Sequence, residues 1–173
     1  MADVFISFIH EEQAIAQAVQ AMLRSQLMRN FEVFMSGDES LVRAGENWLD
    51  RIAGELRDAR VLILLLSPRS VVRPWVNFEA GAAWLAGKHV IPVCYGGLTQ
   101  DALPKPYSDL QAVTLPEGAY YLVKSVFDLL TEGREAKDLF MRGIFIPIPR
   151  SMYTDKDLIR LQHELAKLAA GTA

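Results

Sequence analysis

Residues 61–66 read Val-Leu-Ile-Leu-Leu-Leu, six apolar positions with no polar residue among them. A strand with one face in water would alternate apolar and polar residues. An unbroken apolar run is instead typical of a parallel strand that helices cover on both faces. The run is strand-length and far shorter than the roughly 18 apolar residues of a membrane span. We therefore expect the sequence on either side of it to supply more parallel strands and the helices that cover them.

Strand and helix patterns alternate around this central run. The first helix repeats apolar residues on one face from Ile15 to Leu27. Other strands are predicted at 4–8, 31–35, 89–95 and 111–115, and other helices at about 47–57, 75–86 and 120–130. Five strands that alternate with helices predict an α/β fold with a doubly wound sheet.

Composition limits the class of protein further. The chain has 173 residues, 51% of them hydrophobic and 23% charged, as expected of one globular domain. With a net charge of −3 the chain has no overall basic character, so we do not expect direct binding to nucleic acid. The single cysteine, Cys94, excludes an internal disulfide framework and a cysteine-based zinc site. With no leader-like segment, we expect a cytoplasmic protein or a domain cut from a larger one.

The last 40 residues follow a different pattern. Residues 134–142 could form a short helix, and two prolines make 143–150 extended. A helix over 155–170 places four leucines three or four residues apart: Leu158, Leu161, Leu165 and Leu168. This face could be an oligomer seam or docking helix, or it could simply cover the core of the domain.

Several common site signatures are missing from the sequence. It has no GxGxxG after the first strand, no GxxxxGK[ST] and no GxSxG, which argues against a dehydrogenase, a P-loop NTPase and a serine hydrolase of the elbow type. The three histidines, His10, His89 and His163, lack metal-ligand spacing. We therefore expect neither a metal nor a resident cofactor.

Glu79 is the candidate for chemistry. It is the only charged residue between Trp75 and Gly87, and Trp75 lies one helical turn before it on the same face. Ligands of doubly wound sheets bind beyond the carboxyl ends of the strands, where the loop that carries Phe8, Ile9 and His10 should meet this helix. A carboxylate in an apolar pocket should have a raised pKa. The alternative is a structural Glu79 that caps or pairs near the helix start.

Four stretches in order resemble the conserved boxes of Toll/interleukin-1 receptor (TIR) domains. They are residues 3–8, the BB-loop region 34–46, the strand 61–67, and Trp75-Val-Asn-Phe-Glu79, which matches the WxxxE signature of the enzymatic members. The resemblance runs over about residues 2–131. It implies a flavodoxin-like fold with five parallel strands in the order 2-1-3-4-5. The domain would then occupy 1–132, with 133–173 as a C-terminal extension that could lead to a sensor or partner domain.

The enzymatic branch of the family implies an activity and a set of site residues. The reaction is cleavage of the nicotinamide–ribose bond of NAD⁺, the substrate, to nicotinamide and ADP-ribose or a cyclic isomer. The chain is similar to bacterial effectors of anti-phage defence. By this resemblance Glu79 is catalytic and Trp75 is its aromatic partner. The other substrate-binding candidates are Phe8, Ile9, His10, Ser36, Asp38 and Arg43.

The chemistry of NAD⁺ agrees with a site that has one carboxylate. Glycosidases usually need a second carboxyl group to protonate a poor leaving group. In NAD⁺ the nicotinamide ring is itself a cationic pyridinium. It therefore departs as a neutral molecule and needs no acid to protonate it. One carboxylate can stabilise the developing oxocarbenium charge, and an aromatic ring can stack on a flat base.

Two other classes of function remain open. A non-catalytic TIR interaction module would use the BB loop for homotypic docking, although Ala44 stands where many signalling members have proline. A flavodoxin-like receiver is less well supported, since it would need an acidic cluster and a lysine at the strand ends. The resemblance also implies assembly into a homo-oligomer or filament, because the BB loop of one subunit completes the site of the next.

Overall fold

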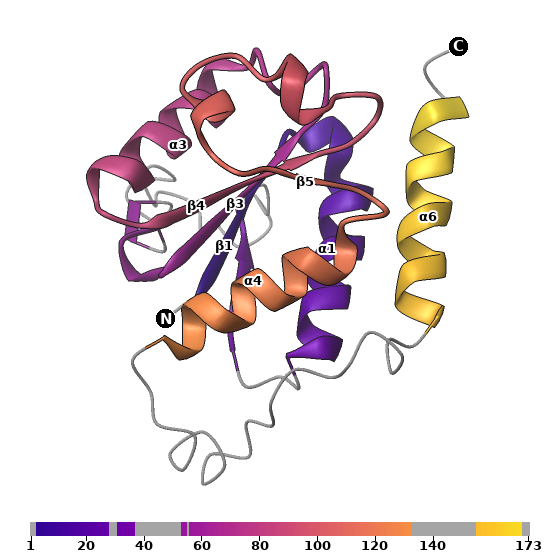
Figure 1. The fold of residues 1–173 in the computed structure, drawn as a ribbon, viewed down its shortest axis with the longest axis horizontal. Coiled ribbons are helices and arrows are strands. Elements are labelled where there is room, and N and C mark those ends of the chain that lie inside the picture. The colour runs from indigo at the N-terminus through magenta and orange to yellow at the C-terminus, as the bar shows by residue number, and fades with distance from the viewer. Residues whose placement is uncertain (1–2, 28–30, 37–52, 55, 133–154, 171–173) are drawn as a thin grey trace, which may run out of the picture.

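The computed structural model describes residues 3–27, 31–36, 53–54, 56–132 and 155–170. Its centre is a five-stranded parallel sheet in the order β2-β1-β3-β4-β5 (Figure 1). The strands are β1 Val4–Ser7, β2 Val33–Met35, β3 Val61–Leu66, β4 His89–Cys94 and β5 Val113–Thr114. The predicted strand order and the doubly wound α/β fold are confirmed.

Helices cover both faces of this sheet. They are α1 Gln13–Gln26, α3 Pro74–Leu85, α4 Ala119–Thr131 and α6 Asp155–Ala170, with single 3-10 turns at His10–Glu12, Gln100–Ala102 and Tyr107–Asp109. Figure 1 shows α3 on one side of the sheet, and α1 and α4 on the other. Of the helix predicted at 47–57, residues 53–54 and 56–58 are helical. Its earlier part, which includes Trp48, lies outside the described residues.

The central strand explains the two-sided core. Every residue of β3 is fully buried. Ile63 and Leu65 belong to the cluster of apolar residues beneath α1 and α4, which we call the α1-side core. Leu62, Leu64 and Leu66 belong to the cluster beneath α3, the α3-side core. The unbroken apolar run in the sequence is thus the strand that helices enclose from both sides.

The C-terminal helix packs on the α1 side of the molecule. Figure 1 shows α6 beside α1, and contacts between the two helices support this placement. Leu161 is fully buried in the α1-side core, and Leu165 packs against it. These side chains agree with a helix that covers the domain. The side chains of Leu158 and Leu168, and residues 134–150, lie outside the described residues, and the boundary at residue 132 stays a prediction.

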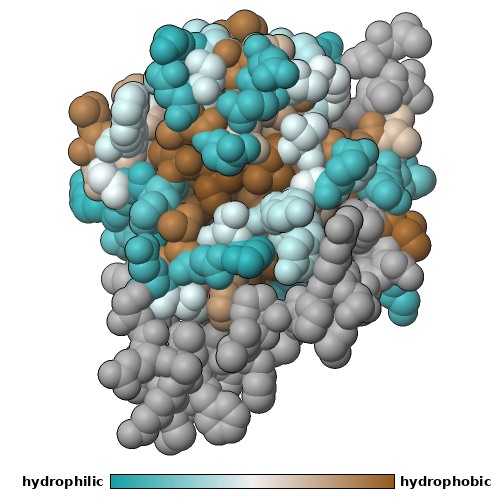
Figure 2. All heavy atoms as spheres, in the orientation of Figure 1, coloured by the Kyte–Doolittle hydropathy of each residue, from teal (hydrophilic) through white to brown (hydrophobic). Residues whose placement is uncertain are grey.

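Some apolar side chains reach the surface. Figure 2 shows a group of them in a hollow at the middle of the face seen there, where Figure 1 draws β4 and β5. On α3, Phe78 and Trp84 are more than half exposed, and Leu85 is almost wholly exposed. None of the helices in the described ranges is long and apolar enough to cross a membrane.

Candidate active site

Glu79 is buried, although a glutamate side chain in water is ionised at neutral pH. It sits in the second turn of α3, which begins at Pro74 after the extended residue Arg73. The side chain has no solvent exposure. Its Oε1 atom accepts a hydrogen bond of 2.9 Å from the indole Nε1 of Trp75, one turn earlier. The shared face predicted for Trp75 and Glu79 is therefore confirmed.

Burial changes the acidity of Glu79. Loss of solvent raises the pKa of its carboxyl group from the usual 4.5 to about 7. The hydroxyl of Ser7 and the indole of Trp75 act in the opposite direction and hold the pKa lower than burial alone would set it. Near neutral pH a substantial fraction of Glu79 is thus ionised and a substantial fraction is protonated.

Three buried side-chain oxygen atoms at this edge of the sheet have no hydrogen-bond partner of normal geometry within the described structure. They are Oε2 of Glu79, Oγ of Ser7 and Oγ of Ser36. The Ser7 hydroxyl is near enough to lower the pKa of Glu79, but it does not meet the carboxylate with normal hydrogen-bond geometry. About nine-tenths or more of the buried polar groups in proteins have a hydrogen-bond partner. Several unpaired oxygen atoms in one region therefore need a physical explanation. A polar ligand or ordered water at this position would supply the hydrogen bonds.

Strand register explains why the two serines are neighbours. Ile6 of β1 pairs with Met35 of β2, so Ser7 and Ser36 follow side by side at the carboxyl ends of the strands. The Ser36 amide also donates to the Ile6 carbonyl at 2.9 Å. Side chains alternate along a strand, so Ser7 shares the α3 side with Phe5. Ser7 was not among the predicted site residues, although its position at the end of a buried strand and this alternation could have indicated it.

The loop after β1 divides its side chains between the two faces of the sheet. Ile9 belongs to the α3-side core, against which Trp75 also packs. Phe8 is buried in the α1-side core, on the other side of the sheet. His10 is exposed in the 3-10 turn that precedes α1. The structure therefore brings Ile9 to the side of Trp75 and does not bring Phe8 there.

These placements leave the substrate-binding roles as predictions. The position of Ser36 beside Ser7 agrees with such a role, whereas that of Phe8 gives it no support. Asp38 and Arg43 lie outside the described residues.

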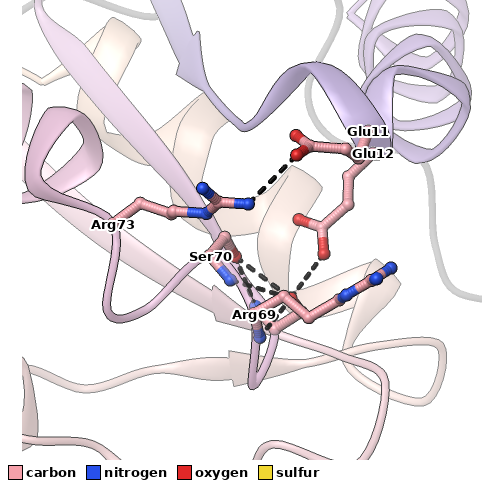
Figure 3. A network of polar contacts seen from close by, with 6 residues as sticks. Glu11, Glu12, Arg69, Ser70 and Arg73 are labelled. Atoms are coloured by element: carbon pink, nitrogen blue, oxygen red, sulfur yellow. Dashed lines mark hydrogen bonds and ion pairs between the residues drawn. The ribbon is translucent and has the colours of Figure 1, made fainter.

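A second buried carboxylate, Glu12, was not predicted from the sequence. It is 3% exposed, and its two oxygen atoms accept hydrogen bonds from the hydroxyls of Ser67, at 2.5 Å, and Tyr95. Figure 3 shows the Glu12 side chain pointing toward the turn that carries Arg69 and Ser70. These partners lie 55 and 83 residues away, so no local pattern could reveal them.

Other possible sites lie elsewhere or have no support. A cavity of about 140 Å³ lies between α3, β4 and residues 106–110, and none of the predicted site residues lines it. In the described part of the chain, no group of three or more His, Cys, Asp or Glu residues could hold a metal ion.

The arrangement around Glu79 can stabilise a positive charge. The ionised carboxylate has one oxygen fixed by Trp75 and a second without a partner among the described residues. The indole ring is stacked with Phe78 at a centroid distance of 5.4 Å, which orients the aromatic side of the site. The hydroxyls of Ser7 and Ser36 can donate to or accept from hydroxyl groups of a ligand.

Comparisons with known proteins agree with this fold. A family model described as a TIR domain matches residues 4–124. A metazoan TIR-STING receptor from C. gigas in complex with 2',3'-cGAMP is similar at 20% identity and a TM-score of 0.57, over 76% of this chain and 40% of that one. A second structure of a metazoan TIR-STING receptor from C. gigas is similar at 22% identity and a TM-score of 0.54, over 76% of this chain and 41% of that one. The chain thus spans about two-fifths of those receptors.

A third similar structure is the TIR domains of the activated Roq1 resistosome, which directly recognises the pathogen effector XopQ, at 18% identity and a TM-score of 0.48, over 97% of this chain and 99% of that one. A search of curated proteins finds no match. The family model covers well over half of the sequence, and the observed strand order is the one that the resemblance implied. The chain belongs to the TIR domain family.

Proposed function

We propose that this TIR domain is an NAD⁺ glycohydrolase. It cleaves the bond between the nicotinamide nitrogen and C1′ of the ribose. Water then supplies a hydroxyl to C1′ and releases a proton, which gives ADP-ribose, or an internal hydroxyl attacks and gives a cyclic isomer. The observation that carries the proposal is the fully buried Glu79, with one oxygen bound to Trp75 and the other without a partner among the described residues.

Glu79 acts in its ionised form. As the C1′–N bond breaks, positive charge develops on the ribose, and a carboxylate in a dry site stabilises that charge far better than water does. Nicotinamide departs as a neutral molecule, so the reaction needs no general acid. A single carboxylate with a pKa of about 7 is therefore sufficient at neutral pH.

The serines and the indole provide the means to hold the substrate. The hydroxyls of Ser7 and Ser36 are suited to the ribose hydroxyls, because all these groups can both donate and accept. The ring of Trp75 offers a face for a flat base. In the same proposal Ile9 lines the apolar side of the site, and His10, Asp38 and Arg43 help to bind the substrate.

The biological role follows from the resemblance described above. We propose a cytoplasmic bacterial anti-phage effector whose activity depends on assembly into a homo-oligomer or filament through the BB loop. The similar TIR-STING receptors are much longer chains, of which this one covers about two-fifths. By analogy, a sensor domain or partner protein would trigger assembly.

Nicotinamide release tests the proposal. Concentrated or crowded protein is incubated with NAD⁺, nicotinamide is quantified by chromatography, and mass spectrometry distinguishes ADP-ribose from a cyclic product. Glu79→Gln, which keeps the shape of the side chain, is the matched control and should release almost none. The proposal fails if wild-type protein consumes no NAD⁺ even when filaments form, or if Glu79→Gln is as active as wild type.

A non-catalytic interaction module is the second candidate. The exposed apolar side chains of α3, Phe78, Trp84 and Leu85, favour it, because a surface of this kind often binds another protein. Such a module would leave NAD⁺ intact, and the triple substitution of these residues by serine would abolish self-association. If wild-type protein releases nicotinamide and Glu79→Gln does not, a non-catalytic module is excluded.

A further inference from the structure

Hydrogen bonds of the Glu12 side chain connect the segments that follow β1, β3 and β4. Glu12 precedes α1, Ser67 follows β3 directly, and Tyr95 follows β4. All three side chains, and that of Ser70, are at least 95% buried. Taking a carboxylate out of water is costly unless hydrogen bonds replace the lost solvent, and here Ser67 and Tyr95 each donate one to it.

The surroundings assign the direction of the two hydrogen bonds to Glu12. The Ser67 oxygen accepts from the amides of Arg69 and Ser70, both at 3.1 Å, so its hydrogen is available for Glu12. Burial and the nearby Glu12 carboxylate raise the pKa of Tyr95, which keeps its phenol protonated and donating. Both oxygens of Glu12 are therefore acceptors, and a side chain without an acceptor oxygen cannot replace it.

The same hydrogen bonds set where α3 begins. Ser70 accepts from the Ser67 amide at 2.8 Å and donates to the Leu65 carbonyl at 3.2 Å, which closes the turn after β3. The Arg73 amide then donates to the Ser70 carbonyl at 3.0 Å, and α3 starts at the next residue. A displaced turn would therefore displace Trp75 and Glu79.

Glu12 is also anchored to the other half of the site. Its amide donates to the carbonyl of Ile9 at 2.8 Å, and Ile9 lies two residues after Ser7. The carboxylate thus joins the loop after β1, which holds Ser7, to the loop after β3, which leads to Glu79. A second link, the ion pair between Glu11 and Arg73 at 3.0 Å, is half exposed (Figure 3). Exposed ion pairs contribute little to stability.

We propose that Glu12 is a positioning residue, which holds Trp75 and Glu79 in register with Ser7 through its hydrogen bonds to Ser67 and Tyr95. The inference rests on the proposed NAD⁺ cleavage for its kinetic consequences. Its structural content, the placement of Trp75 and Glu79 relative to Ser7, is independent of that reaction.

The kinetic test compares Glu12→Gln with Glu12→Ala. Glutamine keeps an acceptor oxygen for Ser67, and its amide can donate to the phenol oxygen of Tyr95 once the phenol hydrogen turns to the neighbouring Ser70 oxygen, so kcat should stay within about 3-fold of wild type. Alanine removes both acceptors, and kcat should fall about 10²-fold with a much smaller change in KM, because misplacement of a catalytic group by about 1 Å costs that much. Tyr95→Phe, which removes only the hydroxyl that donates to Glu12, tests the same link if Glu12→Ala does not fold, and Ser67→Ala, which also removes the acceptor of the Arg69 and Ser70 amides, should have a larger effect.

The matched control is Glu11→Ala, which removes the neighbouring, half-exposed carboxylate and its ion pair with Arg73. Its kcat should stay within about 2-fold of wild type, because half-exposed ion pairs contribute little to stability. A comparable loss of kcat in Glu11→Ala and Glu12→Ala would contradict a specific role for Glu12.

A second measurement does not depend on activity. With Trp48 and Trp84 replaced by phenylalanine, the fluorescence of Trp75 reports ionisation of Glu79, and Glu79→Gln should abolish that pH step. Since the Ser7 hydroxyl lowers the pKa of Glu79, Glu12→Ala or Ser67→Ala should move the midpoint upward, and Glu12→Gln should not. Folded Glu12→Ala or Ser67→Ala with an unchanged midpoint and wild-type kcat would overturn the inference. If wild-type protein releases no nicotinamide, the proposed function fails, and the fluorescence midpoint still decides the role of Glu12.

Discussion

Two glutamates are buried at the carboxyl edge of the same sheet, and their surroundings differ. Both oxygens of Glu12 accept hydrogen bonds from buried hydroxyls. Glu79 has one bond, from Trp75, and among the described residues its other oxygen has none. The pKa of Glu79 rises to about 7 because burial is not offset by enough donors.

The difference separates a structural carboxylate from one that is available for chemistry. Both oxygens of Glu12 already accept hydrogen bonds and its side chain is 3% exposed, so it connects loops and is not open to a ligand. Glu79 has an oxygen without a partner among the described residues, Ser7 lies near it, and Ser36 is the neighbour of Ser7 in the sheet, so one polar substrate could bond to these groups. A buried polar group without a partner is a cost to the fold, and such costs commonly occur at functional sites.

Glu12→Ala should have the largest effect, and it should be on stability. The hydroxyls of Ser67 and Tyr95 would both lose a buried acceptor, and each loss costs about 1–3 kcal/mol, so the free energy of unfolding should fall by about 4 kcal/mol in total. Urea denaturation measures this change. A loss below about 1 kcal/mol would mean that Glu12 is not the acceptor that holds these hydroxyls.

Glu79→Gln should have the largest effect on activity. Loss of the charge that stabilises the transition state should reduce kcat by about 10²–10³-fold, or roughly 3–4 kcal/mol. Nicotinamide release under assembling conditions measures it. A reduction of less than about 5-fold would show that Glu79 is no more involved in chemistry than Glu12.

The same variant should be more stable than wild type at high pH. Between pH 4.5 and about 7, the unfolded chain gives up the Glu79 proton while the folded chain keeps it, so stability falls as pH rises through this window. Above pH 7 the ionised carboxylate costs about 3 kcal/mol, which glutamine avoids. Urea denaturation at pH 5 and pH 8 should show Glu79→Gln gaining stability over wild type only at the higher pH. A gain that is equal at both pH values would contradict this account.

Trp75→Phe should have a smaller effect. It keeps an aromatic ring but removes the indole N–H from Oε1 of Glu79, so the pKa of Glu79 should rise further. A hydrogen bond to a charged group is worth about 1.5–3 kcal/mol, which predicts roughly a tenfold loss of kcat at pH 7 and partial recovery at pH 9. The pH dependence of nicotinamide release would show whether the loss and the recovery occur together.

Much of the fold could be predicted because the signals are local. The unbroken apolar run of β3 indicated a strand covered on both faces, and the four-residue spacing of Trp75 and Glu79 placed them on one helix face. The alternation of side chains along β1 could also have shown that Phe8 points to the same face of the sheet as Val4 and Ile6. Ser7 points to the opposite face, with Phe5. The helical periods of α1, α4 and α6 gave their approximate bounds.

The polar interior could not be predicted in this way. Glu12 meets Ser67 and Tyr95 only after three strands have assembled, and a glutamate at a helix start is usually exposed. Likewise, the juxtaposition of Ser7 and Ser36 depends on the register between β1 and β2. The sequence specifies these contacts through tertiary packing and leaves no short-range pattern.

The pH dependence of kcat/KM for nicotinamide release between pH 5 and pH 9, measured with NAD⁺ well below KM and at fixed assembly state, tests the central claim most directly. If ionised Glu79 stabilises the transition state, kcat/KM should rise about tenfold per pH unit at low pH and level off with a midpoint near 7, the pKa that burial gives this carboxyl group in the ligand-free protein. Activity that is flat across this range, or whose midpoint lies near the ordinary 4.5 of a glutamate, would contradict a catalytic role for the buried carboxylate.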